Sequence, residues 1–220
     1  VLIVVAHADD ETFGCGGSIL RHIEEGDEVS LVTLTNGVSA RIELKDTDLS
    51  QRKFSAEKAL SILGVNWIAQ GDFPDNSMDN IPFLSVVQFI EAIKDKIDPD
   101  IIYTHSLSDL NIDHRITHQA VLTACRPQPN FSVKEIYSFE VLSSTEWASS
   151  SIQKAFVPSK FVDISKTFKQ KMTSLNCYSD EMREFPHSRS IDSLTALSIL
   201  RGSSVGVSYA EAFQVERIIS

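Results

Sequence analysis

The sequence has few cysteines, a deficit of basic residues and no long apolar run. Its three cysteines, Cys15, Cys125 and Cys177, are odd in number and far apart, so they form no disulfide framework and favour a reducing compartment such as the cytoplasm. Lysine and arginine total 20 against 30 aspartates and glutamates, and this net charge of −10 disfavours binding to nucleic acid or to an anionic membrane surface. The opening run VLIVVA is too short to span a bilayer, and no other apolar run reaches that length, so we expect no membrane insertion.

Glycine and proline are also scarce, with 9 and 7 residues, which excludes collagen-like and low-complexity chains. A chain of 220 residues, of which 42% are apolar, can bury the core of one α/β domain but is too short for two large ones. No Gly/Ser/Pro-rich linker interrupts it. We therefore expect a single domain over residues 1–220, with a core of about 1–142 and a C-terminal cap of about 143–220.

Short aliphatic runs predict strands, and apolar residues spaced at i, i+3, i+4 and i+7 predict helices. The predicted strands cover residues 1–6, 29–35, 66–70, 100–104 and 134–141. Predicted helices follow the glycines at 14, 16 and 17 and cover about 56–63, 86–97 and 114–125, and the cap is expected to hold a strand over 157–164 and helices over 165–177 and 190–200. This alternation predicts a Rossmann-like, mostly parallel sheet with helices on both faces and functional groups in the loops after the strands.

Two such loops carry residues that suit a metal ion. HADDE (residues 7–11) follows the first predicted strand, and DLNIDH (residues 109–114) follows the fourth. Two imidazoles and one carboxylate from these loops are three ligands suited to Zn²⁺ with an open position for water, and a second carboxylate beside them could take a proton from that water. Taken singly, the acidic residues also suit the N-terminal ends of the following helices, where Asp113 could be a cap.

The same segments resemble a known family. AHADDETFGCGGSIL is similar to the AHPDDE signature of the PIG-L (LmbE-like) zinc-dependent N-deacetylases, with Ala8 where the family usually has proline. RKFSAEKALSILG (residues 52–64) resembles the family's helix that starts with arginine, and DLNIDHR (residues 109–115) resembles its second metal motif, usually His-x-Asp-His. RGSSVGVSYAEAF (residues 201–213) resembles its closing segment, so the resemblance covers most of the chain.

The resemblance implies that His7, Asp10 and His114 bind Zn²⁺ and that Asp9 is the general base. The implied reaction is hydrolysis of an acetamide on an amino sugar, with release of acetate. In the absence of a spanning run, we expect a small soluble substrate, either a free or a nucleotide-linked N-acetyl sugar. The sequence leaves open whether the chain forms a homo-oligomer.

One departure from the family pattern is Asn111, which replaces the histidine that helps to stabilise the oxyanion. Asparagine can donate a hydrogen bond but cannot carry the positive charge. We expect His187 to supply the missing imidazole, with His105 as the second candidate. Asp113, which partners the missing histidine in the family, is expected either to orient one of these or to cap its helix.

Arg52 and Arg189 are candidate substrate contacts, and the alternatives are an exposed helix charge and a structural arginine. Two other functions remain open. One is an amidase that acts on a thiol or another small conjugate. The other is a non-catalytic nucleotide- or metal-binding module, suggested by the strand, glycine loop and helix at the start of the chain, although the glycines lack the G-x-G-x-x-G spacing.

Overall fold

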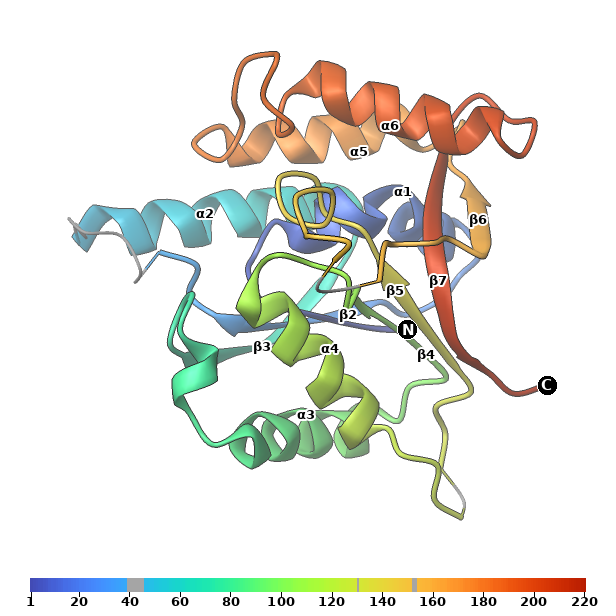
Figure 1. Ribbon diagram of the computed structural model, residues 1–220. Coiled ribbons are helices and arrows are strands. Elements are labelled where there is room, and N and C mark those ends of the chain that lie inside the picture. Colours follow the sequence, from blue (N-terminus) through green and yellow to red (C-terminus); the bar gives the residue numbers. More distant parts are fainter. Residues whose placement is uncertain (39–45, 130, 152–153) are drawn as a thin grey trace.

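The computed structural model describes residues 1–38, 46–129, 131–151 and 154–220, in which a seven-stranded sheet lies between two layers of helices (Figure 1). The strands are β1 (Leu2–Val5), β2 (Ser30–Thr35), β3 (Asn66–Phe73), β4 (Ile101–His105), β5 (Glu135–Phe139), β6 (Lys160–Asp163) and β7 (Ala210–Ile218). The helices are α1 (Asp10–Glu24), α2 (Asp46–Leu63), α3 (Phe83–Ile97), α4 (Ile112–Ala124), α5 (Phe168–Leu175) and α6 (Ile191–Ser203), with short 3-10 turns η1 (Met78–Asn80) and η2 (Asn176–Tyr178). Among the described residues, no helix is long and apolar enough to cross a membrane.

The strand order creates a switch point at β1. The strands lie in the order β3-β2-β1-β4-β5-β7-β6, and the first five are parallel. The chain runs outward from β1 to β3 and then returns to the other side of β1 at β4. At such a reversal, the loops after the two adjacent strands diverge and leave a crevice at their carboxyl ends, where ligands bind. The two loops that carry the predicted metal ligands therefore meet.

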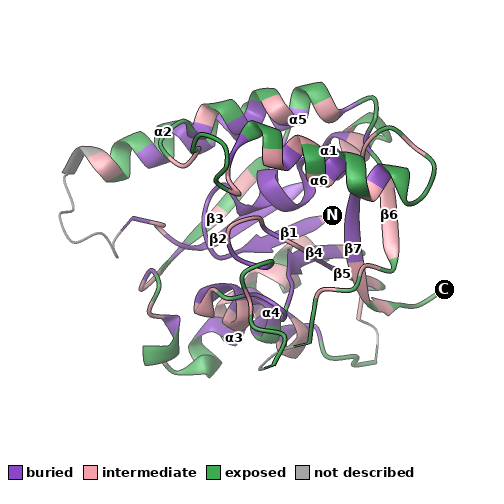
Figure 2. Ribbon diagram, turned by 45° about the horizontal axis from the view of Figure 1, so that its top comes forward, coloured by how far each residue is buried: buried purple, intermediate pink, exposed green. Residues whose placement is uncertain are grey.

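The continuous apolar run of β1 is explained by burial on both faces of the sheet. Leu2 and Val4 pack in one half of the core, towards α3 and α4, and Ile3 and Val5 pack in the other half, towards α1. All four are fully buried. Figure 2 shows the buried strands at the centre and the exposed residues on the outer faces of the helices. The predicted α/β class with a mostly parallel sheet is confirmed.

The C-terminal part of the chain contributes strands to the sheet as well as covering it. β7 pairs antiparallel with β5, β6 pairs antiparallel with β7, and α5 and α6 lie on the same face of the sheet as α1 and α2 (Figure 1). The sequence analysis predicted β6, α5 and α6 but not β7. The helix around Arg52 also begins earlier than predicted, at Asp46, so Arg52 lies in the second turn of α2.

Candidate metal centre and active site

The loops after β1 and β4 bring the predicted metal ligands together. His7 follows β1, Asp10 begins α1, and His114 lies in the first turn of α4, just after the loop that follows β4. All three are polar yet buried, with exposed fractions of 8%, 0% and 2%. Such a cluster at the carboxyl edge of a parallel sheet indicates a ligand site.

Three side-chain atoms of this cluster form a nearly equilateral triangle. Nδ1 of His7 lies 3.2 Å from Oδ2 of Asp10, and Nε2 of His114 lies 3.3 Å from that nitrogen and 3.4 Å from that oxygen. In a tetrahedral zinc site with bonds of about 2.0 to 2.1 Å, neighbouring ligand atoms are about 3.3 to 3.4 Å apart. The residues present therefore fit a zinc ion without rearrangement.

The remaining oxygen of Asp10 also fits a bound cation. Oδ1 of Asp10 is buried and has no hydrogen-bond partner among the described residues. A buried carboxylate oxygen without a partner is costly. A metal ion held by the triangle would place a positive charge beside this carboxylate and offset that cost.

Each histidine of the triangle contacts a further carboxylate through its other ring nitrogen. Nδ1 of His114 lies 3.1 Å from Asp109, and Nε2 of His7 lies 3.1 Å from Asp75 and 3.3 Å from Asp113. Carboxylates in these positions fix the tautomer and the orientation of metal-ligating imidazoles.

Asp75 and Asp109 are site residues that the sequence analysis missed. Asp109 lies inside the quoted loop and could have been found, because metal-ligating histidines usually have a carboxylate partner. Asp75 gave no such signal, since it lies five residues beyond the predicted end of its strand at residue 70.

The neighbouring carboxylates control the protonation of the two histidines. Burial alone would lower the pKa of His114, but Asp10 and Asp109 outweigh it and raise this pKa to about 9. The pKa of His7 is likewise raised well above its ordinary value despite burial, through Asp10, Asp113 and Asp75. With four carboxylates around two imidazoles, the site favours a divalent cation.

Asp113 has neither of the two roles that were predicted for it, and the cap of its helix is Asn111. The Asp113 carboxylate accepts hydrogen bonds from the backbone N–H groups of Asn76 at 2.6 Å and Met78 at 3.1 Å, and it contacts His7 rather than orienting His105 or His187. The cap of α4 is Asn111, whose Oδ1 accepts the Asp113 N–H at 2.8 Å. Asparagine is a preferred N-cap, which gives the departure from the family pattern a local reason.

Asp9 lies beside the triangle but contacts arginines instead of histidines. Its Oδ1 lies 3.1 Å from Nη2 of Arg52, and its Oδ2 accepts a hydrogen bond from Nη1 of Arg189 at 2.9 Å. Its backbone has φ 151° and ψ −27°, and its N–H donates to Glu11 at 3.0 Å. A non-glycine residue in such a conformation costs about 1 to 3 kcal/mol and is typical of functional sites.

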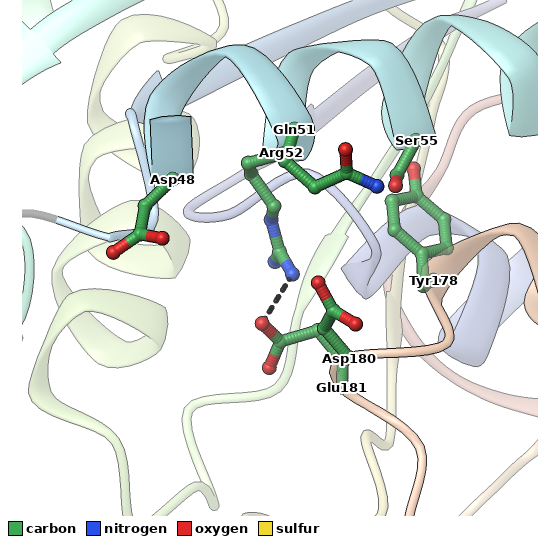
Figure 3. A pocket seen from close by; sticks show the side chains of 7 residues that line it. All are labelled: Asp48, Gln51, Arg52, Ser55, Tyr178, Asp180 and Glu181. Carbon is green, nitrogen blue, oxygen red and sulfur yellow. Dashed lines mark ion pairs between the residues drawn. The ribbon is translucent and has the colours of Figure 1, made fainter. Parts of the chain in front are cut away.

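Glu181 connects the two arginines that hold Asp9. Its carboxylate lies 2.8 Å from Nη1 of Arg52 and 3.6 Å from Nη1 of Arg189. Figure 3 shows the Arg52 side chain pointing from its helix towards the segment that carries Tyr178 and Glu181. These three residues line a cavity of about 20 Å³, which is large enough for one water molecule. Burial would lower the pKa of Arg52, but Asp9 and Glu181 raise it, so this side chain stays charged.

A larger cavity of about 250 Å³ opens beside Asp9. Six of the predicted site residues line it: His7, Asp9, Arg52, Asn111, His187 and Arg189. Asp75, Glu181 and Arg183 contribute further charged groups. The lining is mostly polar, which suits a ligand with many hydroxyl or anionic groups.

The two candidate histidines lie in different surroundings. His187 lines the cavity, its ring packs edge-on against Trp147 at 5.8 Å, and its Nδ1 accepts the Arg189 N–H at 3.0 Å. His105 is fully buried, stacks on His114 at 3.8 Å and accepts a backbone N–H through Nε2. Burial and the nearby His114 lower the pKa of His105 to about 4, so it is neutral and cannot supply positive charge to the cavity.

The fold and this constellation define a Rossmann-like α/β protein with a candidate metal site at the switch point of its sheet. The family model described as PIG-L, GlcNAc-PI de-N-acetylase, matches residues 2–125, which is more than half of the chain. The chain belongs to the PIG-L family, as its sequence motifs predicted, and with it to the N-deacetylases.

The individual relatives have different named activities. A protein named uncharacterized deacetylase YaiS from Escherichia coli is 28% identical over 173 residues, covering 76% of this chain and 83% of its own. A 4-oxalmesaconate hydratase from Pseudomonas putida is 26% identical over 198 residues, covering 80% of this chain and 71% of its own. In fold, the chain is similar to the N,N'-diacetylchitobiose deacetylase of Pyrococcus horikoshii, with a TM-score of 0.79, 21% identity and coverage of 98% of this chain and 83% of that one.

Proposed function

We propose that this chain is a zinc-dependent N-deacetylase that removes the acetyl group from a small amino sugar, free or nucleotide-linked, and releases acetate in the cytoplasm. The observation that carries the proposal is the zinc-sized triangle of His7, Asp10 and His114, with Asp9 beside it at the edge of a polar cavity. The deacetylases among its relatives support the same reaction.

His7, Asp10 and His114 would hold the metal ion. When bound, zinc polarises an amide carbonyl and makes a water molecule more acidic. Asp75, Asp109 and Asp113 keep the two imidazoles in the tautomer and orientation that ligation needs, because their oxygens lie within 3.3 Å of the ring nitrogens that face away from the triangle and favour a hydrogen on them.

Asp9 acts as the general base in this mechanism. It accepts a proton from the water that attacks the acetamide carbonyl, while Arg52 and Arg189 keep its carboxylate in place. Both arginines line the cavity and also contact the substrate, so binding of the sugar and positioning of the base are coupled.

His187 supplies the hydrogen-bond donor of the family's histidine, whose place in the sequence is taken by Asn111. Since its Nδ1 accepts the Arg189 N–H, its neutral form carries the hydrogen on Nε2 and can donate from that atom. In this mechanism the Nε2–H of His187 hydrogen-bonds the developing oxyanion, and Asp9 gives the proton that it took from the water to the leaving amine. Asn111 can add a second hydrogen bond from its place on the cavity wall.

The proposal is tested by measuring acetate release from a panel of N-acetylated sugars, free and nucleotide-linked, with the zinc-loaded protein. We expect release from at least one of them, loss of release after chelation, and recovery when zinc is returned. N-acetylated thiol conjugates are included in the panel, because acetate release from these alone would indicate the amidase alternative.

The hydratase relative defines a competing reaction for the same site. Arg52, Arg183 and Arg189 all line the cavity, and three guanidinium groups also suit an unsaturated acid with several carboxylates. The panel therefore includes 4-oxalmesaconate, and its hydration is monitored through the loss of its ultraviolet absorbance. Hydration without acetate release from any amide would overturn the proposed function.

A further inference from the structure

Helix α1 is broken little more than one turn after the metal ligand Asp10. Cys15 has φ −142° and ψ 18°, which is not helical. In a continuous helix the N–H of Gly17 would donate to the carbonyl of Phe13, and the N–H of Ser18 would donate to the carbonyl four residues before it. The break interrupts this pattern inside the buried part of α1, where backbone groups need hydrogen-bond partners.

Two charged side chains from the C-terminal part of the chain supply hydrogen-bond partners at the break. Glu211 of β7 accepts the N–H groups of Gly17 at 2.8 Å and Ser18 at 2.7 Å. Nζ of Lys171 in α5 donates to the carbonyl of Phe13 at 2.8 Å and to Glu211 at 2.6 Å. The exposed fractions of Lys171 and Glu211 are only 3% and 5%. Their ion pair is therefore buried, and each of its charges also satisfies the broken backbone.

The glycines of the segment GCGG allow this close approach. A Cβ atom on Gly17 would lie 2.7 Å from Ile164, and one on Gly16 would lie 3.3 Å from Lys171. The hydroxyl of Thr167 also donates to the Gly17 carbonyl at 3.0 Å. The glycine loop and the closing segment, which the sequence analysis singled out separately, thus meet at the break in α1.

We propose that Lys171 and Glu211 are positioning residues that hold the break in α1 and so fix the direction of its first turn, which begins at Asp10. The inference rests on the zinc site of the proposed function and extends it to residues that do not line the cavity. Metal sites require their ligands to be held within about 0.5 Å of the productive geometry. Asp10 meets that requirement only while the first turn of α1 is held at its observed angle to the rest of the helix.

The test compares the zinc affinity of matched variants by competition with a chromogenic chelator at constant pH. Lys171→Met removes the charge but keeps most of the volume, and Glu211→Gln keeps the shape. The control is Arg201→Met, which removes the ion pair with Glu140, a pair with a similar distance of 2.7 Å between α6 and the segment after β5. We expect zinc to bind about 10- to 100-fold more weakly to the first two variants, the usual effect of losing support behind a metal ligand, and with unchanged affinity to the control.

The outcomes separate this inference from the proposed function. A wild-type protein that binds no zinc would overturn the proposed function, whereas zinc binding of wild-type strength in folded Lys171→Met and Glu211→Gln would overturn only the positioning role. If neither variant folds, hydrogen exchange on the wild-type protein decides. We expect added zinc to slow exchange of the Gly17 and Ser18 amides more than that of Leu200 in α6, and equal exchange with and without zinc at Gly17 and Ser18 would contradict the inference.

Discussion

At the scale of single residues, the two adjacent aspartates that follow Ala8 have opposite surroundings. Asp10 faces histidines, and Nδ1 of His7 and Nε2 of His114 lie within 3.4 Å of its Oδ2. Asp9 faces the guanidinium groups of Arg52 and Arg189. A carboxylate among imidazoles suits a metal ligand, and one held by arginines at a cavity suits a base, so the surroundings of the two residues agree with the roles that we propose for them.

The first prediction concerns Asp9. Asp9→Asn should keep bound zinc and lower kcat by about 10²- to 10⁴-fold with little change in KM, because it removes a base but no ligand. Steady-state kinetics and elemental analysis of the same sample provide the measurement. Loss of zinc from Asp9→Asn would show that the roles of Asp9 and Asp10 are exchanged.

The second prediction separates the two candidate histidines. His187→Ala should lower kcat by about 10²-fold or more while the unfolding free energy and the zinc content stay near those of the wild type, since this side chain is exposed at the cavity. His105→Ala should instead lower the unfolding free energy, because it empties a fully buried site beside His114. Kinetics and urea titrations of both variants test this, and full activity of His187→Ala would remove His187 from the mechanism.

The candidate metal ligands and the candidate base could be predicted because short sequence motifs contain them. His7, Asp9 and Asp10 lie in one such motif, and their predicted neighbour His114 lies in another. The partner of Asp113 could not be predicted, because it depends on the path of the segment after β3, whose backbone at Asn76 and Met78 approaches α4. Contacts of this kind arise from tertiary packing and have no local pattern in the sequence.

At the scale of elements, the residue that caps α4, Asn111, also lines the cavity. Asn111 caps the helix through the Asp113 N–H, and its side-chain amide donates to Asn76 at 3.1 Å. Together these bonds join the loop before α4 to the segment after β3. The residue that departs from the family pattern therefore has a structural role whether or not it contacts substrate.

The third prediction concerns this cap. Asn111→Ala should lower the unfolding free energy by about 1 kcal/mol, the usual loss for an N-cap side chain, as measured by urea denaturation. Ser190→Ala, which removes the matching cap of α6, is the control and should cost a similar amount. Unchanged stability of Asn111→Ala beside a destabilised Ser190→Ala would show that Asn111 contributes no capping energy.

Helices and strands with a regular pattern of apolar residues were predicted, whereas a strand that depends on pairing with its neighbours was not. β1 is a continuous buried run and α3 has a clear apolar face, so both were predicted close to their observed bounds. β7 has the sequence AEAFQVERI, in which only the first four residues are buried. Its strand conformation depends on pairing with β5 on one side and β6 on the other, which local periodicity does not reveal.

At the scale of the whole molecule, burial divides the three free thiols into two classes. Cys15 and Cys125 are buried, whereas Cys177 is partly exposed. Burial raises the pKa of Cys125 to about 11 and that of Cys15 well above its usual range. Since the thiolate is the reactive form, both thiols remain protonated and unreactive near neutral pH.

The fourth prediction follows from these pKa values. Iodoacetamide at pH 8 should modify one thiol per folded chain, at Cys177, and all three in denaturant, as counted by mass spectrometry. Raising the pH towards 11 should increase the reaction of Cys125, because a raised pKa shifts formation of its thiolate to higher pH. Rapid modification of Cys15 in the folded protein at pH 8 would contradict the packing around the break in α1.

The overall architecture could be predicted because alternating strands and helices leave few topologies for a parallel sheet. The place of the C-terminal part could not be predicted in the same way. Glu211 and Lys171 reach α1 from β7 and α5, and this contact joins residues 194 positions apart in one case and 158 in the other. Such long-range contacts complete the site but appear in the sequence only as separate motifs.

The zinc site that we propose consists of His7, Asp10 and His114 and lies beside a separate base, Asp9. Its most direct test is the zinc content of the purified wild-type protein and of Asp9→Asn, Asp10→Ala and His114→Ala, each shown to be folded by circular dichroism. We expect about one equivalent per chain in the wild type and in Asp9→Asn, and a sharp loss in the other two variants. Zinc content that is unchanged in Asp10→Ala and His114→Ala would contradict it.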